Sequence, residues 1–336
     1  MRSSSEGISG LKAEAGETGI DLSVIVVSWN TRDLLRDCLA SIFRETPRAA
    51  CDVEVLVVDN ASTDGSPDMA AREFPAVRLI RNAANQGFAA ANNQGVRQAR
   101  GRHILFLNPD TRIIGDALGA MVRFLDGRPE AGGVCPMVVN ADGTVQSLGR
   151  SLPGLGGVFV KGFFPDGWTA AVRGWADRIR GRAGKDVLEV PGFPGAAMMI
   201  PRRVLDGVGL LDEDLPFYAE DIDLCRRIAD RGRTLYCLPG CRIVHLGGRS
   251  AGLAPVSSEV RSRLSLYAFL RKHRKPSISA AARVLIVVSS MLRFSVWTVS
   301  SLAAGPRTRR RAAREREACR ALIRWGLGLS RQPEGS

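Results

Sequence analysis

The sequence predicts an α/β fold built around a mostly parallel β-sheet. Through the first 110 residues, short apolar runs rich in β-branched residues alternate with segments whose apolar residues recur at helical spacing. That alternation is typical of βαβ units, and runs that are apolar throughout are typical of strands buried on both faces. The 45% hydrophobic content of the 336 residues supports a packed core.

The elements follow one another in chain order. Apolar runs predict strands at 22–28, 53–59, 77–80, 103–107, 234–238 and 243–244. Helical spacing predicts helices over 31–43, 64–73, 88–100 and 220–229, the first of them capped by Asn30-Thr31. Residues 150–186 lack a clear period, and we interpret them as a long loop or short helices beside a ligand site.

The formal net charge of +13 is unevenly distributed. Residues 1–250 hold 30 basic and 30 acidic side chains, whereas residues 251–336 hold 17 basic and 4 acidic ones, so 17 − 4 = +13. A uniformly basic nucleic-acid-binding surface is therefore disfavoured, and a neutral body with a basic C-terminal region is expected.

The start of the chain and its cysteines predict a cellular compartment. Residues 1–20 are polar and rich in Gly and Ser, so we expect a disordered leader with no secretory signal. The seven cysteines form no C-x-x-C pair, which favours free thiols in a reducing cytosol.

The C-terminal region contains an apolar run, residues 278–304, between two basic clusters. Arg283 and Arg293 interrupt it, and the longest uncharged stretch, 294–306, has 13 residues, fewer than the roughly 20 that a spanning helix needs. We therefore expect one or two helices lying in a membrane interface, with these arginines at the headgroups. The alternative is an ordinary packed helix with a solvated basic tail.

Polar residues follow three of the predicted strands. They are Ser28-Trp29-Asn30, Asp59-Asn60-Ala61-Ser62 and Asn108-Pro109-Asp110. Ligands of open α/β sheets bind beyond the carboxyl ends of the strands, so these loops predict one crevice. Neither G-x-G-x-x-G after the first strand nor G-x-x-x-x-G-K-[ST] occurs, which argues against the usual dinucleotide and P-loop sites. Taken singly, each loop could be a simple turn.

Five motifs in order resemble family 2 glycosyltransferases, in particular the rhamnosyltransferase-type branch of bacterial cell-wall and O-antigen synthesis. They are Ser23-Val-Ile-Val-Val-Ser-Trp-Asn30, Val57-Val-Asp-Asn-Ala-Ser-Thr-Asp64, Asn85-Gln-Gly-Phe-Ala-Ala-Ala-Asn-Asn-Gln-Gly95, Leu107-Asn-Pro-Asp110 and Tyr218-Ala-Glu-Asp-Ile-Asp-Leu224. The resemblance covers about residues 22–275. It implies a GT-A domain over 21–250, with a nucleotide-sugar half (21–112) and an acceptor half (113–250), followed by the basic helical region 251–336.

The resemblance also implies roles for single residues. For the nucleotide sugar it implies Ser28, Asn30, Asp59, Asn85, Gly87, Asn92, Asn108 and Asp110, with Asp59 bonded to the base. Asp110 is the expected metal ligand, because the family's D-x-D motif here has Asn108 in place of its first acid. His245 is either a further metal ligand or diphosphate contact, or a hydrogen-bonded residue at the sheet edge.

The chemistry implied is inverting transfer from a nucleoside diphosphate sugar, assisted by Mg²⁺ or Mn²⁺. In such a displacement the acceptor hydroxyl loses a proton as it attacks, and a positioned carboxylate accepts it. The resemblance assigns that role to Asp221, with Glu220 placing the acceptor or sugar. Asp223 is expected to be structural. Acids at these positions are also favoured simply because they begin a helix.

The expected donor is dTDP-rhamnose, with UDP-hexoses second, and the expected acceptor is a saccharide on a polyprenyl diphosphate. The expected location is peripheral, on an anionic membrane surface at the cytoplasmic face of the inner or plasma membrane. Two other classes are weaker. A nucleotidyltransferase needs a glycine- and arginine-rich loop after the first strand, which Ser28–Arg32 does not provide. The zero net charge of residues 1–250 argues against a nucleic-acid-binding protein, so no nucleic-acid partner is expected.

Overall fold

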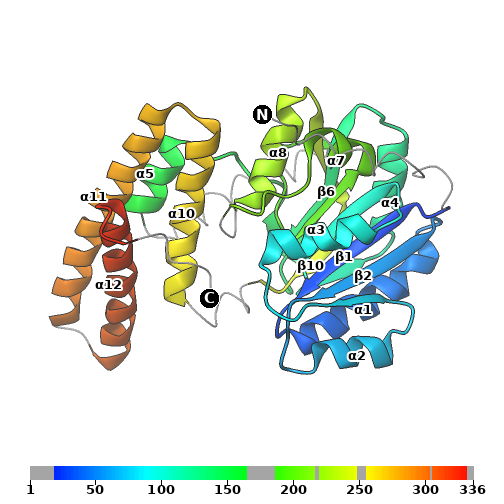
Figure 1. Cartoon of the computed structure of the whole chain (residues 1–336), viewed down its shortest axis with the longest axis horizontal. Coiled ribbons are helices and arrows are strands. Elements are labelled where there is room, and N and C mark those ends of the chain that lie inside the picture. The colour runs from blue at the N-terminus through cyan, green and yellow to red at the C-terminus, as the bar shows by residue number, and fades with distance from the viewer. Residues whose placement is uncertain (1–18, 165–185, 216–218, 248–254, 303–304, 331–336) are drawn as a thin grey trace, which may run out of the picture.

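The computed structural model describes residues 19–164, 186–215, 219–247, 255–302 and 305–330. An α/β body lies beside a bundle of long helices formed mainly by the C-terminal region (Figure 1). The predicted α/β class is confirmed. The expected leader falls almost wholly outside the described residues, as do residues 165–185 of the irregular segment.

One ten-stranded sheet forms the centre of the body, in the order β3-β2-β1-β4-β9-β6-β10-β5, with β7 paired to β6 and β8 to β10. Its strands are β1 Leu22–Ser28, β2 Val53–Asp59, β3 Arg78–Arg81, β4 His103–Leu107, β5 Thr111–Ile114, β6 Ala131–Val139, β7 Val145–Ser147, β8 Leu188–Glu189, β9 Ala197–Pro201 and β10 Thr234–His245. Strands β3, β2, β1 and β4 are mutually parallel, whereas β9 runs antiparallel to β4 and β6. Strand β10 is parallel to β6, and β5 closes the edge antiparallel to it.

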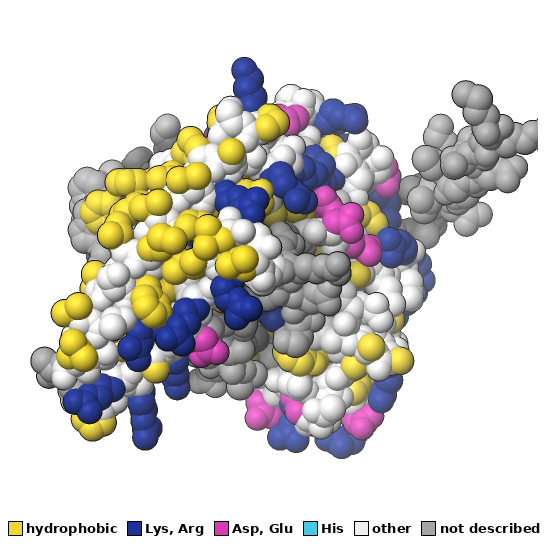
Figure 2. Space-filling view, turned by 60° about the vertical axis from the view of Figure 1, so that its left-hand side comes forward, with side chains coloured by type: hydrophobic (Ala, Val, Ile, Leu, Met, Phe, Trp, Pro, Cys, Tyr) yellow, Lys and Arg dark blue, Asp and Glu magenta, His cyan; other side chains and the backbone are white. Residues whose placement is uncertain are grey.

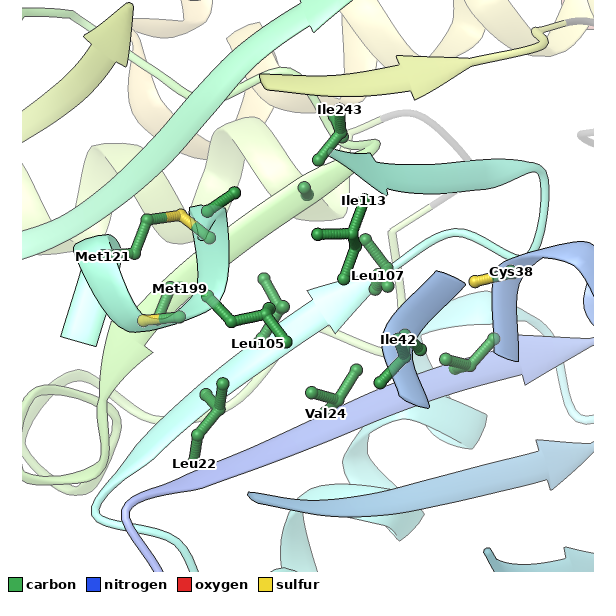
Figure 3. Packing of buried hydrophobic residues seen from close by; sticks show 14 of the residues in the cluster. Leu22, Val24, Cys38, Ile42, Leu105, Leu107, Ile113, Met121, Met199 and Ile243 are labelled. Atoms are coloured by element: carbon green, nitrogen blue, oxygen red, sulfur yellow. The ribbon is translucent and has the colours of Figure 1, made fainter. Parts of the chain in front are cut away.

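Helices cover both faces of the sheet. They are α1 Arg32–Glu45, the 3₁₀ turn η2 Thr46–Arg48, α2 Ser66–Glu73, α3 Phe88–Gln98, α4 Ala117–Asp126, α7 Arg202–Val208 and α8 Glu220–Asp230. Because successive side chains of a strand point to opposite faces, β1 contributes to two cores. Val24 packs with Ile42 of α1 and Met121 of α4 (Figure 3), whereas Ile25 belongs to the core under α3, α7 and α8.

Four helices form the second region: α5 Leu155–Phe163, α10 Pro255–His273, α11 Pro276–Leu302 and α12 Pro306–Gly326. They share an apolar core that includes Val158, Phe269 and Ile286, and Ile222 of α8 packs into it from the body. Helix α5, which comes from the segment expected to be loop or short helices, thus joins elements about 100 residues further along the chain.

A buried carboxylate connects the two regions. Asp223 of α8 is fully buried and bonds Lys272 and His273 of α10, each at 2.7 Å, as well as Arg227 of its own helix at 2.8 Å. Burial alone would raise the pKa of Asp223, but these hydrogen bonds outweigh it and keep the pKa below its ordinary value. In the structure Asp223 therefore holds α10 against α8.

The expected orientation of the C-terminal arginines was wrong. Arg283 donates to the backbone oxygen of Gly326 at 2.9 Å, and Arg293 pairs with Glu315 at 3.0 Å, so both turn toward α12. Two neighbouring serines, Ser289 and Ser290, are also buried. The side of α11 that carries these polar groups is its packed side, and protein partners bond both arginines and Ser289 there.

Candidate active site

The carboxyl ends of β1 and β2 place Ser28 and Asp59 beside one another. The two residues are register partners, and both are buried. Asp59 Oδ2 accepts a hydrogen bond from the backbone N–H of Ser62 at 3.0 Å, whereas Oδ1 is buried with no partner among the residues that the structure describes. A buried carboxylate oxygen without a donor is costly, so this atom is suited to a hydrogen bond from a ligand.

Asn60, the residue after Asp59, organises the loop before α3. Its side-chain nitrogen donates to Asn85 Oδ1 at 2.9 Å and to the Gly87 carbonyl at 3.1 Å, and its oxygen accepts from Gln86 N at 3.0 Å. Gly87 begins α3 at φ +83°, a conformation that residues with a Cβ rarely adopt. Sequence reasoning gave Asn60 no role, although it stands inside the Asp59-Asn60 motif.

Two of the predicted donor-binding residues use their side chains to brace the protein. Asn30, at φ +52°, accepts from the backbone N–H of Thr63 at 2.8 Å. Asn92 is buried and donates to the carbonyl of Phe88 in its own helix at 2.9 Å. Asn30 lies beside Ser62 at the carboxyl ends of the strands. The side-chain N–H of Asn92, in contrast, points back along α3 to Phe88.

Asp110 and His245 meet at the same edge of the sheet, on the side away from Ser28 and Asp59. His245 Nε2 lies 3.3 Å from Asp110 Oδ1, and His245 Nδ1 lies 2.8 Å from Gln146 Oε1. An amide oxygen only accepts, so Nδ1 donates and Nε2 is the ring nitrogen that faces Asp110. Nε2 and a carboxylate oxygen at this distance can hold a proton or a cation between them. Gln146 was not predicted.

This donor set fits a divalent cation. Magnesium commonly takes one or two carboxylates and completes its shell with phosphate and water oxygens, and manganese also accepts imidazole nitrogen. Among the described residues, no group of three or more His, Cys, Asp and Glu side chains converges, so the protein itself offers a pair. The backbone carbonyl of Asn108 accepts a hydrogen bond from Thr111 Oγ1 at 2.7 Å.

Glu220 and Asp221 form the first turn of α8, and both are buried. Asp221 Oδ2 accepts from Arg150 Nη1 at 2.9 Å, and its Oδ1 accepts from the Ile222 backbone at 2.8 Å. Gly195 lies against it so closely that a Cβ there would approach Oδ2 to 2.6 Å. Arg150 was not predicted, and it comes from the segment without a clear period.

A short stretch of backbone connects this turn to the side of the edge that holds Asp110. The N–H of Asn108 donates to the carbonyl of Ala196 at 3.0 Å, and Gly195, the residue before Ala196, touches Asp221. Leu246 N donates to the carbonyl of Asp110 at 2.9 Å, which fixes the end of β10 beside the same loop. The structure therefore gathers Asp59, Asp110 and Asp221 at one edge of the sheet.

The two acids of α8 differ in electrostatics. Burial, with a smaller contribution from the charge of Asp221, raises the pKa of Glu220 to about 8, so at neutral pH its carboxyl is mostly protonated. Asp221 is paired with the guanidinium of Arg150 at 2.9 Å. The pair can thus supply one neutral hydrogen-bonding carboxyl and one carboxylate able to accept a proton.

A mixed sheet with polar residues at its strand ends is the arrangement found in the GT-A class of glycosyltransferases, and this chain has that fold. The model of glycosyl transferase family 2 matches residues 23–208, more than half of the chain, and the protein belongs to this family. The resemblance of the motifs to family 2 glycosyltransferases is thereby confirmed.

Relatives and solved structures agree with this assignment. The chain is 30% identical, over 86% of its length and 96% of the relative's, to the N-acetylglucosaminyl-diphospho-decaprenol L-rhamnosyltransferase of Mycobacterium tuberculosis. It is 35% identical, over 39% of its length and 36% of the relative's, to a succinoglycan biosynthesis protein of Rhizobium meliloti. The fold is similar to that of a mannosyltransferase from Pyrobaculum calidifontis solved with GDP-Man and Mn²⁺, with a TM-score of 0.55, 19% identity, and coverage of 90% of this chain and 87% of that one.

Substitution of the two α8 acids should separate their roles. We expect Asp221→Asn to lower kcat by about 10²–10⁴-fold, because an amide cannot accept the proton. Glu220→Gln should keep kcat within about fivefold at pH 7, since a neutral amide resembles the protonated carboxyl and its oxygen can still accept from Ala219 N. Steady-state transfer assays measure both variants, and donor titration checks that Asp221→Asn still binds. Wild-type turnover in Asp221→Asn would contradict the assignment.

The raised pKa of Glu220 predicts a pH dependence of stability. The folded state keeps this proton up to about pH 8, whereas a free glutamate loses it near about pH 4.3. Between these values the folded state binds more protons than the unfolded state, so the unfolding free energy should fall as pH rises. Urea unfolding between pH 5 and 9 should show a flatter decline in Glu220→Gln. An unchanged slope in that variant would assign the titration to another group.

Proposed function

We propose that the protein transfers rhamnose from dTDP-rhamnose, with inversion, to a saccharide carried on a polyprenyl diphosphate. The observation that carries the proposal is the similarity, over 96% of its length, to an L-rhamnosyltransferase whose name specifies an N-acetylglucosaminyl-diphospho-decaprenol acceptor. The site supports it, because one sheet edge holds both a nucleotide-type contact at Asp59 and a buried carboxylate at Asp221. The enzyme would act as a peripheral protein at the cytoplasmic face of the membrane, where its donor is soluble.

The nucleotide is bound at the ends of β1 and β2 in this proposal. Asp59 Oδ1, which has no partner within the described part of the chain, accepts a hydrogen bond from an N–H of the pyrimidine base. Ser28 and Asn30 line the pocket, and the backbone around Gly87, with Asn85 held by Asn60, approaches the donor. Asn92 contributes from within α3 by shaping the helix rather than through its amide nitrogen, which is already bonded.

The diphosphate is bound on the other side, beside Asp110, His245 and Asn108. Asp110 and His245 would hold Mg²⁺ or Mn²⁺, and the bound cation would stabilise the negative charge that grows on the leaving diphosphate. Gln146 orients His245 by accepting from Nδ1, which directs Nε2 toward Asp110. Asn108 adds an amide oxygen without charge, suited to a ribose hydroxyl or a water.

Asp221 accepts the proton of the acceptor hydroxyl as that hydroxyl attacks the sugar. Arg150 fixes the position of the carboxylate, and Gly195 leaves room for it. Protonated Glu220 donates a hydrogen bond to the acceptor or to the sugar. One attack opposite the leaving diphosphate inverts the configuration at the anomeric carbon.

A thermal-shift screen tests the donor. We expect dTDP-rhamnose with Mg²⁺ to raise Tm more than UDP-glucose, UDP-N-acetylglucosamine or GDP-mannose at equal concentration, because a ligand present at 100 times its Kd adds about 2.7 kcal/mol of stability. Asp59→Asn should weaken dTDP binding by about 10–100-fold, the equivalent of one hydrogen bond to a charged group. A larger shift with a UDP-hexose would replace rhamnose by that sugar.

Metal titration tests the diphosphate side. Asp110→Asn should raise the Mg²⁺ or Mn²⁺ concentration for half-maximal activity by at least about tenfold, since it removes the only charged ligand of the pair. Gln146→Ala should raise it less, because it only frees the imidazole to rotate. Isothermal titration of Mn²⁺ in the presence of dTDP gives the same comparison without turnover. Full activity of the wild-type protein in excess EDTA would overturn the metal assignment.

A further inference from the structure

Helix α11 carries a continuous apolar face that the protein leaves exposed. Seven large apolar side chains on it are between 43% and 75% exposed, namely Val284, Val288, Met291, Leu292, Val296, Val299 and Leu302. At 100° per residue they fall within an arc of about 140°. Figure 2 shows this stripe running across the helical region, with Lys and Arg side chains beside it.

The opposite side of α11 is buried and carries polar side chains beside the apolar Ala282 and Ile286. Of the polar ones, Arg293 bonds Glu315, and Ser289 lies against Gly162 of α5. A helix at a water interface has the reverse arrangement. The apolar face therefore suits a medium that is itself apolar.

The helical region that contains α11 also carries aromatic and basic side chains. Phe159 of α5 and Phe164, the residue after that helix, are exposed, and their ring centroids lie 6.3 Å apart. On the side of α11 that faces α12, Arg311 and Arg320 lie over the rings of Trp297 and Phe294, each 5.3 Å from the ring centroid. Aromatic and arginine side chains are the residues that prefer the headgroup level of a bilayer.

Positive charge also gathers at both ends of α11. Exposed basic residues precede the helix at Arg271, Arg274 and Lys275, and follow it at Arg309, Arg310 and Arg314. Each basic residue near an anionic leaflet contributes about as much as a modest hydrogen bond, and such contributions add. The charge complementarity selects an anionic lipid surface rather than a second copy of this chain, whose own arginines would repel it.

We propose that the exposed face of α11, with Phe159 and Phe164, is a membrane-docking surface that inserts into an anionic bilayer while α11 lies parallel to it. Helix α11 is long and apolar enough to cross a membrane, with a mean hydropathy of 1.5. Crossing would expose Arg283 and Arg293 to lipid and break their bonds to α12, which docking preserves.

Docking also sets the distance of the site from the lipid. Asp221 lies two residues before Asp223, whose bonds to Lys272 and His273 hold α8 to the docked bundle. The diphosphate of a lipid-linked acceptor lies at the headgroups, so the bundle would keep Asp221 near that level. The purpose of the surface rests on the proposed function, but docking itself is measurable without donor or acceptor.

Sedimentation with vesicles tests the surface. The full chain should sediment with vesicles containing phosphatidylglycerol, and Val288→Glu/Val299→Glu should reduce the partition coefficient at least about tenfold, because two charges replace two inserted apolar side chains. Ile114→Glu is the matched control. Ile114 is an exposed apolar residue of β5 in the α/β body, 45% exposed, and this variant should bind as the wild type does. Circular dichroism confirms that both variants fold.

Two further measurements distinguish the outcomes. Arg309→Gln/Arg310→Gln/Arg314→Gln should lose affinity for anionic vesicles and flatten its salt dependence. The proposal is overturned if Val288→Glu/Val299→Glu sediments as much as the wild type does. It is also overturned if the wild type is a dimer in solution that this variant dissociates while vesicle binding persists. If the wild type docks but transfers sugar from no donor, the proposed function fails and the docking surface stands.

Discussion

The parallel register of β1 with its neighbours is the constraint on which the site depends. Ser28 pairs with Asp59 and Val26 with Leu107, so the loops after β1, β2 and β4 leave the sheet at one edge. Because β1 is apolar on both faces, burial alone specifies its register weakly. A buried polar pair at the other end specifies it: Ser23 Oγ donates to Glu54 Oε1 at 2.6 Å and accepts from Gly101 N. A slip of β1 would break both of these Ser23 bonds, so a contact at the far end of the sheet helps to align the loops at the carboxyl edge.

The first turn of α8 uses three carboxylates in three environments. Glu220 is mostly neutral because it is buried, Asp221 is paired with Arg150 from the body, and Asp223 is bonded to Lys272 and His273 of α10. A helix N-terminus favours negative charge, which makes this turn a suitable place to concentrate acids. The consequence is mechanical as well as chemical, because the same turn that holds the proposed base is fixed on one side to the sheet edge and on the other to the helical bundle. A displacement of α10 would reach Asp221 through two residues of rigid helix.

The sequence predicted what is encoded locally. Strands β1 to β4 and helices α1, α3 and α8 show clear periods, and the acids at their ends stand in recognisable motifs. It did not predict Arg150 or Gln146, whose partners Asp221 and His245 lie 71 and 99 residues away, because a single polar residue in an irregular segment has no periodic signal. Strands β5, β6 and β9 were not predicted for a related reason: a strand that joins a sheet through distant partners is specified by tertiary contacts. The roles assigned by family resemblance to the site residues, including Asp59 and Asp110, remain predictions.

The orientation of α11 shows how the same composition can be interpreted in two ways. From sequence, Arg283 and Arg293 look like the solvated side of an amphipathic helix, because charged residues are normally outside. In the structure Glu315 and the carbonyl of Gly326 satisfy them, which removes the reason to expose them and leaves the valine-rich side outward. Rotating the helix would bury those valines but leave Glu315 without its ion pair, so in water neither orientation satisfies both sides. A lipid surface satisfies both, since the arginines keep their protein partners and the apolar face leaves water. The excess positive charge, which lies wholly in residues 251–336, then acts at the same surface instead of marking a nucleic-acid-binding protein.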